Sequence, residues 1–433
     1  MKTPVPPMPP EGAVDLVVDA PFAATAQQIE FSARLVDAAG ERRLWFRFPA
    51  DDAPMLTRRA DPFVIATLVY AMDRYKRMNI HGAVSPGLLA NLADFQSAYQ
   101  AFHRGRPVPP MELQASSTAE EFRPARTPRG ISAFSGGVDS CFTVYRHTPL
   151  SSLQPKRLLS GSLMMHGFDI PLEQRETFLR AAARSRHLTD DAGLALHLGA
   201  TNLRSLPVKW EDIYATAVAA CLAFYQPAYS YGLLPSFQDW SHTKFNYGSS
   251  PLTDPMLSSL SFPIVHDGTS FGRIQKLELL ARWPMAMRHL RVCWQGAEMD
   301  RNCCRCEKCV RTMLMLELVG VSQADAFPLP VDPSAIERLV IKGPNALEEQ
   351  IYLLTEAKRR GLQAPWVPAV ARTISRNRRR QRLWQAGKAL KDFVPAAMQD
   401  GFRSAANRIL WRSRARTHSR AAAPVNGTKA HVH

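Results

Sequence analysis

Residues 130–141 read GISAFSGGVDSC, and this stretch decides how the rest of the chain is interpreted. A short apolar run ends in Ser135-Gly136-Gly137-Val138-Asp139-Ser140, and a second apolar run follows. Glycine permits a positive φ and lets main-chain N–H groups approach a ligand. A helix that starts at about Asp139 would direct its positive end at the same place. The pattern therefore predicts a strand, an anion-binding turn and a helix.

The turn matches neither of two common phosphate-binding motifs. It has no Gly-x-x-x-x-Gly-Lys-Ser/Thr, so no lysine of that motif would reach a γ-phosphate, and it has no Gly-x-Gly-x-x-Gly, which disfavours a dinucleotide fold. Two adjacent glycines alone would indicate only a tight βα turn. The hydroxyls of Ser135 and Ser140 add hydrogen-bond donors, and together with the glycines they favour a socket for an anion with several oxygens.

The sequence around the turn alternates between strand-like and helix-like patterns. Strands are expected at the start of the quoted stretch, in RLLSGSLMMHGFD (157–169) and in LALHLGATN (194–202). Helices are expected after the first two strands, and DIYATAVAACLAFYQ (212–226) carries so little charge that it predicts a buried helix. This alternation predicts an α/β fold with a doubly wound parallel sheet over residues 130–330.

Three further segments surround that domain. Residues 1–103 predict a small α+β unit that contains a hairpin and two helices. Residues 104–129 are rich in Pro, Ser, Arg and Glu without a period and are expected to be a linker. Residues 331–433 are expected to form a basic helical extension with a disordered end.

Composition bounds the class of protein. The chain has 433 residues, of which 46% are hydrophobic and 21% charged, as in ordinary globular proteins. Its apolar runs are shorter than the roughly 18–20 residues of a membrane span. The start, MKTPVPPMPPEG, is Pro-rich and has no apolar signal region. We therefore expect a soluble, cytoplasmic protein.

Most of the excess positive charge lies near the C-terminus. Residues 371–420 hold 14 Lys and Arg against two Asp, so they carry +12 of the formal net charge of +16. The body of the chain therefore has no basic surface that would indicate nucleic-acid binding all over it. The tail favours RNA or an anionic membrane surface as a partner, and a solvated tail without a partner is the alternative. A homodimer is also possible.

Five of the seven cysteines fall within 17 residues, in the order Cys293-x₉-Cys303-x₂-Cys306-x₂-Cys309, with Cys304 in addition. A Cys-x-x-Cys pair lets two thiolates face one ion, and four thiolates without a water site are typical of a structural metal. Zinc fits this ligand set best, and an iron–sulfur cluster is the alternative. Cys304 has no assigned role, although it could replace Cys303 as a ligand.

Other polar residues stand where the predicted strands end. His166 and Asp169 follow the second strand, and Arg204 follows the third. Ligands of open α/β sheets bind outside the carboxyl ends of the strands, so these residues are expected near the glycine turn. A strand-end turn without a ligand is the alternative for each of them. Asp254 lies in the hydroxyl-rich stretch 248–259, which fits either a substrate-binding loop or a capped turn.

Three basic residues are the last candidates for the functional site. Arg273 and Lys276 open a predicted helix, where one of them could reach phosphate, although a solvated helix face is the more common outcome. Arg311 lies two residues after Cys309, so a metal could fix its position. Arg311 is therefore the best candidate for a functional cation outside the turn.

The string SGGVDS, in its strand–turn–helix context, resembles the pyrophosphate loop of the PP-loop ATP pyrophosphatases. The order SGGVDS, then Cys-x₉-Cys-x₂-Cys-x₂-Cys, then Arg311 resembles the 7-cyano-7-deazaguanine synthase family, which are zinc-containing ligases of the queuosine pathway. The resemblance covers roughly residues 128–320. It implies an adenine nucleotide alpha-hydrolase-like fold, with ATP, Mg²⁺ and Zn²⁺ as cofactors.

The resemblance also implies a reaction. A substrate carboxylate, 7-deazaguanine-like or another small acid, would be adenylated with release of pyrophosphate, and ammonia or an amine would then displace AMP. Ser135, Asp139, Ser140 and Arg311 would be catalytic. The nucleotide would contact the whole Ser135–Ser140 string together with His166 and Arg204. An RNA-modifying adenylase of the tRNA-thiolation type, and a non-catalytic nucleotide-binding module that recruits a partner or a membrane, are the alternatives.

Overall fold

The structure is a computed structural model, and it describes residues 12–104, 109–123, 126–243, 245, 247–293, 295–296, 298–341 and 344–393. The Pro-rich start and the end of the basic extension, 394–433, lie outside the described residues. Among the helices that are described, none combines the length and the apolar character that a membrane crossing requires.

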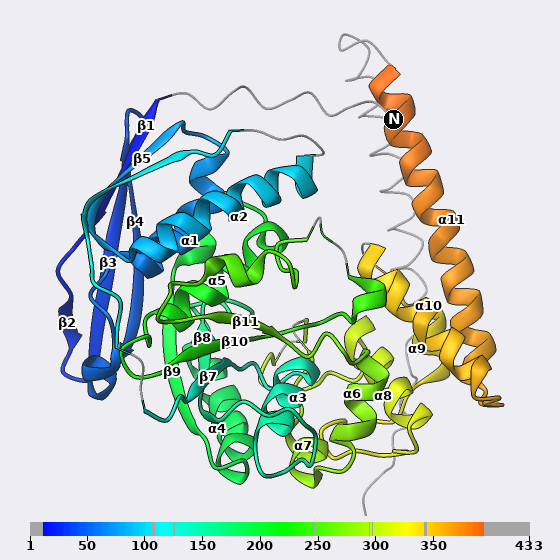
Figure 1. Ribbon diagram of the computed structural model, residues 1–433. Helices are drawn as coiled ribbons and strands as arrows, with labels where there is room; N and C mark the ends of the chain where they lie inside the picture. The colour runs from blue at the N-terminus through cyan, green and yellow to red at the C-terminus, as the bar shows by residue number, and fades with distance from the viewer. Residues whose placement is uncertain are drawn as a thin grey trace, which may run out of the picture.

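One mixed sheet of 11 strands runs through the molecule (Figure 1). Its strand order is β11-β10-β7-β8-β9-β4-β3-β1-β5-β6, and β2 pairs with β3 beside this path. The strands are β1 Ala13–Val18, β2 Phe22–Thr25, β3 Gln28–Asp37, β4 Gly40–Pro49, β5 Arg77–Val84, β6 Glu112–Thr118, β7 Gly130–Ala133, β8 Leu159–His166, β9 Ala195–Thr201, β10 Tyr231–Pro235 and β11 Ile264–Asp267.

The five strands of the second half are parallel to one another, in the order β11-β10-β7-β8-β9. The chain moves from β7 outward through β8 to β9 and then returns to the other side of β7 with β10 and β11. The strand order therefore reverses between β7 and β10, as in a doubly wound sheet. The predicted α/β class is confirmed, and residues just after β7 lie at the point where such sheets bind ligands.

The N-terminal strands continue this sheet. The predicted hairpin is confirmed as β3 and β4, and β4 pairs antiparallel with β9 through Phe46↔Thr201. The Asn202 side chain accepts a hydrogen bond from Trp45 N at 2.8 Å and so secures the same junction. This pairing was not expected from the sequence. It satisfies the main-chain groups of β9 that would otherwise form an open edge.

The segment 104–129 contains strand β6, so the expectation of a linker without structure is wrong for Glu112–Thr118. This strand pairs parallel with β5 at the far end of the sheet. Its sequence, ELQASST, is mostly polar and half-exposed or exposed, because an edge strand buries little on either face. For that reason the strand lacks the apolar alternation by which strands are found in a sequence.

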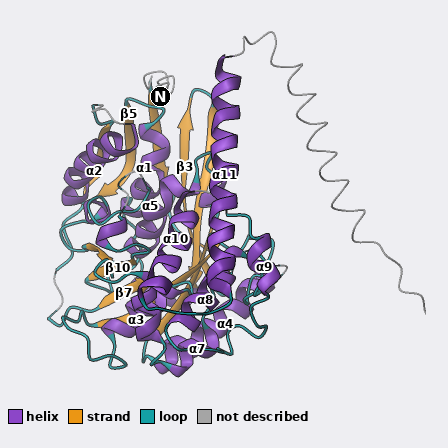
Figure 2. Ribbon diagram, turned by 90° about the vertical axis from the view of Figure 1, so that its right-hand side faces the viewer, coloured by secondary structure: helices purple, strands orange, loops and turns teal. Residues whose placement is uncertain are grey.

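Helices cover both faces of the sheet (Figures 1 and 2). Helices α1 and α5 pack against each other on one side, whereas α3 packs against α6 and α4 packs against α7 on the other. The helices are α1 Asp61–Met72, α2 Pro86–Arg104, α3 Val138–His147, α4 Arg175–Asp191, α5 Trp210–Ala223, α6 Arg273–Leu280, α7 Pro284–His289, α8 Glu307–Leu318, α9 Pro333–Arg338, α10 Pro344–Arg359 and α11 Trp366–Phe393.

An aromatic cluster joins the N-terminal hairpin and α1 to the end of α5. Phe224, directly after α5, is fully buried, and its ring centroid lies 5.0–5.7 Å from those of four other phenylalanines. Large aromatic side chains contribute most of the burial energy in such a core. We call this cluster the Phe224 junction, and it consists of Phe224 with Phe31, Phe46, Phe48 and Phe63.

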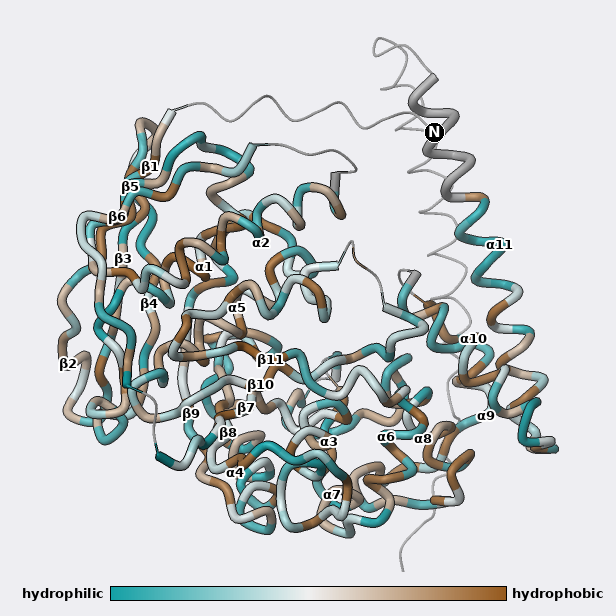
Figure 3. Tube along the Cα trace, in the orientation of Figure 1, coloured by the Kyte–Doolittle hydropathy of each residue, from teal (hydrophilic) through white to brown (hydrophobic). Residues whose placement is uncertain are grey.

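The C-terminal helices form a separate layer beside the sheet. Helix α10 packs against α8, and α11 packs against α9 and α10 through Val370 and Ile374. Beyond these contacts α11 extends past the body, as Figure 2 shows. Hydrophilic positions are frequent along it in Figure 3, in contrast to the apolar α1. The predicted helical extension is thus confirmed as far as residue 393.

Candidate functional site

A large cavity opens where β7 ends, at the reversal of the strand order. Its volume is about 2140 Å³, and its wall includes the Ser135–Ser140 loop, the ends of β8, β9 and β10, and residues of α6 and α8. Pockets for one small ligand usually measure about 300–1000 Å³. The cavity therefore has room for two ligands side by side.

The loop holds its shape through its own glycine and hydroxyl groups. Gly136 has a φ of +74°, which a residue with a Cβ adopts only with strain. Ser140 Oγ accepts a hydrogen bond from Ser135 N at 3.2 Å and donates one to Gly137 O at 3.1 Å. Helix α3 begins after Gly137, and no side chain caps it. Its first N–H groups are therefore open to an anion in the cavity.

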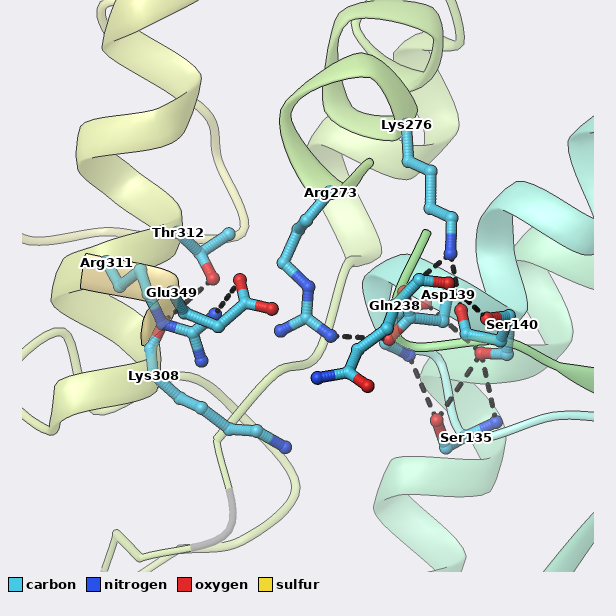
Figure 4. A network of polar contacts seen from close by, with 12 residues as sticks. Ser135, Asp139, Ser140, Gln238, Arg273, Lys276, Lys308, Arg311, Thr312 and Glu349 are labelled. Atoms are coloured by element: carbon cyan, nitrogen blue, oxygen red, sulfur yellow. Dashed lines mark hydrogen bonds and ion pairs between the residues drawn. The ribbon is translucent and has the colours of Figure 1, made fainter. Parts of the chain in front are cut away.

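Asp139 lies among cations on the other side of the loop (Figure 4). Its carboxylate is 2.7 Å from Arg273 Nη2 and 3.2 Å from Lys276 Nζ. Burial opposes ionisation of Asp139, but Arg273 and Lys276 outweigh it, and the pKa of Asp139 lies below its ordinary value. Lys276 is only 1% exposed and also donates to Ser236 O, so the interpretation of these cations as a solvated helix face is wrong.

Lys308 extends from α8 into the space between α8 and the loop (Figure 4). Its ammonium group makes no hydrogen bond or ion pair with the residues that the structure describes, and it lies in the cavity wall. Burial, and then the positive charges of Arg273 and Arg311, lower the pKa of Lys308. Lys308 is the cation of this wall that is best placed to meet an anionic ligand.

Arg311 also lies in the cavity wall, but its guanidinium is already engaged. It donates to Glu307 at 2.8 Å and to Glu349 at 2.9 Å. Arg311, the cation that the sequence favoured, is thus held by two carboxylates. Lys308, directly before Cys309, was missed although it carries the same signal of proximity to a cysteine ligand.

Arg291 is a second residue that the sequence did not reveal. Its main-chain N–H donates to Gly136 O at 2.7 Å, and its Nη2 donates to Ser135 O at 3.1 Å. The same nitrogen is 2.6 Å from a carboxylate oxygen of Asp169. Arg291 thus supports the loop from behind and connects it to Asp169 after β8.

Of the two other residues predicted to contact the nucleotide, one lies in the cavity wall and one does not. Arg204 lies in the cavity wall, where its Nη1 donates to Phe168 O at 3.1 Å and its guanidinium covers the Trp210 ring at 4.8 Å. His166 does not belong to the wall. Its Nε2 is 2.8 Å from Pro171 O, its ring stacks on Phe178, and burial lowers its pKa. His166 Nε2 is therefore engaged by the backbone, and the residue takes no part in the cavity wall.

Asp254 likewise lies outside the cavity wall. Its buried carboxylate accepts from Ser249 Oγ at 2.8 Å and contacts His266 Nδ1 at 2.6 Å. These contacts close the turn that contains Asp254 and agree with the interpretation of 248–259 as a capped turn.

Four of the cysteines converge on one point. The sulfur atoms of Cys293, Cys303, Cys306 and Cys309 all lie within 4.8 Å of one another. Two of the pairs are 3.8 and 3.9 Å apart. A tetrahedral ion with metal–sulfur bonds of about 2.3 Å would place its ligands about 3.8 Å apart. This four-cysteine group can therefore hold a metal such as zinc.

Cys304 stands apart from the four-cysteine group. It has a φ of +55°, and its sulfur lies 3.8 Å from Asn302 O. Its neighbour Cys303, and not Cys304, belongs to the group of converging sulfurs. The alternative that Cys304 replaces Cys303 as a ligand therefore does not fit this arrangement.

Comparison with known proteins found no family model that matches the chain, and neither a curated protein nor a solved structure matches it.

Proposed function

We propose that this protein is an ATP-dependent ligase that adenylates a small carboxylate and releases pyrophosphate and then AMP. The observation that carries the proposal is the SGGVDS loop at the reversal of the strand order, with the uncapped start of α3 open to the cavity. The resemblance of this loop to that of the PP-loop ATP pyrophosphatases supports the same reaction. An adenine nucleotide alpha-hydrolase-like fold is part of the proposal.

Each part of the loop would have a separate task. The N–H groups at the start of α3 and the hydroxyls of Ser135 and Ser140 would stabilise the charge that develops on the leaving pyrophosphate. Lys308, across the cavity, would meet the same charge with an ammonium group that has no other partner among the described residues. Fixed donors of this kind need no reorganisation during the reaction.

Mg²⁺ would arrive with ATP and neutralise part of its phosphate charge. Asp139 is the expected carboxylate ligand, but both of its oxygens are paired with Arg273 and Lys276. Binding of the ion to Asp139 would therefore require one of these pairs to open. Asp169, which is 37% exposed and paired with Arg291, is the other carboxylate of the cavity wall close to the loop.

The second substrate would occupy the part of the cavity beyond the loop. Aromatic side chains line it there, with the rings of Phe168 and Trp210 4.9 Å apart and Tyr214 beside them. A flat acid, 7-deazaguanine-like or of another kind, could stack on these rings. Arg204 covers Trp210 and could pair with the carboxylate of such an acid. Ammonia or an amine would then displace AMP.

We assign zinc to the four-cysteine group as a structural metal. The sulfur–sulfur distances of 3.8 and 3.9 Å fit four thiolates on one ion. A cluster of several irons distributes its thiolates over different metal atoms and would hold them further apart. Metal analysis of the purified protein tests the assignment, and a brown protein with broad visible absorbance would contradict it.

The products of ATP cleavage test the function. The protein is incubated with ATP, Mg²⁺ and candidate carboxylates, and we expect AMP and pyrophosphate. Ser135→Ala should reduce AMP formation by about a hundredfold to a thousandfold, the effect of losing one transition-state donor. Asp139→Ala should also reduce it, because the expected Mg²⁺ ligand is lost. Circular dichroism should show an intact fold in both variants. ADP and phosphate as products would reject the proposal, and tight ATP binding without turnover would favour a nucleotide-binding module.

A second candidate, an RNA-modifying adenylase, is favoured by one observation. On α11, four exposed arginines have no carboxylate partner among the described residues, namely Arg378, Arg379, Arg380 and Arg382. The cavity wall, in contrast, carries eight basic and seven acidic side chains, so it has little net attraction for a polyanion. An RNA would therefore be held mainly by α11, and binding of tRNA that weakens steeply with salt would support this candidate.

A further inference from the structure

A short segment connects the anion loop to the four-cysteine group. Arg291 donates its main-chain N–H to Gly136 O at 2.7 Å and its Nη2 to Ser135 O at 3.1 Å. Cys293, one of the four converging cysteines, follows only two residues later. A displacement of Cys293 therefore acts on Arg291 through a single intervening residue.

Asn302 fixes this segment to the loop that carries the other cysteines. Its Oδ1 accepts from Val292 N at 2.9 Å and from Cys293 N at 3.2 Å, and its Nδ2 donates to Leu290 O and Ala326 O, both at 2.8 Å. All four hydrogen-bonding positions of this buried amide are used. The segment from Leu290 to Cys293 is thus held on both sides of Arg291.

The opposite wall of the cavity depends on the same cysteines. Helix α8 follows Cys306, whose sulfur accepts from Cys309 N at 3.5 Å at the start of the helix. Lys308 lies between these two cysteines and extends toward the loop (Figure 4). A metal that draws the four sulfurs together would therefore fix both the support behind the loop and the cation in front of it.

Arg291 is placed to transmit this effect rather than to contact solvent. Its side chain is 4% exposed, and its charge is paired with Asp169. Its Nη1 donates to Met299 O at 2.9 Å, so the guanidinium bridges the loop and the segment before Cys303. Replacing it would leave Ser135 O without this donor at the point where the loop begins.

We propose that Arg291 is a positioning residue that couples the Ser135–Ser140 loop to the four-cysteine group, so that pyrophosphate at the loop and a metal ion at the cysteines strengthen each other's binding. The proposal rests on the proposed function, because it takes the loop to be a pyrophosphate site. By linkage, each ligand must change the affinity of the other by the same factor.

The experiment measures the zinc affinity of the full-length protein by competition with a chromophoric chelator, with and without saturating inorganic pyrophosphate. In the wild type we expect pyrophosphate to tighten zinc binding by about fivefold or more, the lower end of typical coupling. In Arg291→Met the protein should still bind one zinc ion, but pyrophosphate should change the affinity less than in the wild type. The variant loses the side-chain bond to Ser135 O and keeps the main-chain bond to Gly136 O. Arg291→Lys, which retains the charge and one donor, should recover part of the coupling.

Arg301→Met is the matched control. Arg301 is an exposed arginine close to the same cysteines, it pairs with Glu298, and it does not belong to the cavity wall. It should keep the full coupling. If Arg291→Met does not fold, Arg291→Lys decides the question, because a coupling equal to that of the wild type would overturn the proposal.

Two outcomes in the wild type separate this inference from the proposed function. Pyrophosphate that binds without changing the zinc affinity overturns the coupling and leaves the ligase proposal intact. Absence of pyrophosphate binding, together with absence of AMP formation, overturns both.

Discussion

The Phe224 junction and the Ser135–Ser140 loop belong to the same sheet, but different forces hold them. The junction consists of five phenylalanine rings from the two strands of a hairpin, from α1 and from the end of α5, and it contains no charge. The loop is held by hydrogen bonds from Arg291 and Ser140, and by the ion pairs of Asp139 at its far side. Burial stabilises the first region, and directional polar contacts stabilise the second.

Because different forces hold the two regions, substitutions in them should have different effects. Hydrophobic burial is non-directional and scales with area, so a change in the junction should cost stability without altering the cavity. A hydrogen bond or an ion pair specifies positions, so a change near the loop should alter ligand binding as well. The four-cysteine group is the exception, because metal binding contributes folding energy in a region that otherwise depends on polar contacts.

The largest loss of stability is expected from Cys306→Ser. Structural zinc sites bind with an apparent free energy of about 10–16 kcal/mol, and much of this supports folding, so the loss of one ligand should lower the free energy of unfolding by more than about 5 kcal/mol. Urea unfolding and metal analysis of the same samples measure it. Cys304→Ser, which lies outside the group, should retain one metal ion. A Cys306→Ser protein of unchanged stability would show that the metal does not support this region.

Phe224→Ala should have the next largest effect. Truncation of a buried phenylalanine costs about 3–5 kcal/mol, because the transfer energy is lost and a cavity remains. Pyrophosphate binding by the folded protein should be unchanged, since no residue of the junction belongs to the cavity wall. Trp240→Ala, at a side chain that is 61% exposed, is the control and should cost little. Loss of pyrophosphate binding in Phe224→Ala would remove the distinction between the two regions.

Local patterns were enough to predict much of this molecule. The strand before Ser135, the turn and the start of α3 are specified by neighbouring residues, namely an apolar run, two glycines and flanking hydroxyls. The spacing of the cysteines likewise predicted which four converge, because two thiolates three positions apart can reach one ion. The low charge of 212–226 predicted that α5 is buried.

The remaining features depend on contacts between distant residues. The pairing of β4 with β9 brings together Trp45 and Asn202, which are 157 positions apart, and no local pattern encodes such a pairing. Arg291 is one of 54 Lys and Arg, and only the fold shows that its side chain meets Ser135 O. That Arg311 is already paired could not be seen in the sequence for the same reason, since the two carboxylates that bind it come from different helices.

The smallest of the three stability effects is expected from Asp139→Asn, and it depends on pH. Burial opposes ionisation of Asp139, but Arg273, Lys276 and the more distant Lys308 lower its pKa in the folded protein. A carboxyl group with a lowered folded pKa stabilises the fold above its unfolded pKa of about 3.9, and this contribution is lost as the pH falls through the folded value. The variant lacks the contribution at every pH.

At pH 7 the difference in unfolding free energy between wild type and Asp139→Asn should be about 2 kcal/mol, below the 3–5 kcal/mol of a fully buried pair, because Asp139 is 21% exposed. The difference should shrink as urea unfolding is repeated below about pH 4. Asp325→Asn, at an exposed pair with Arg288, should show no such change. For Phe224→Ala the difference should stay constant with pH, because no proton is involved. If the Asp139→Asn difference also stayed constant, Asp139 would stabilise the loop by its shape and not by its charge.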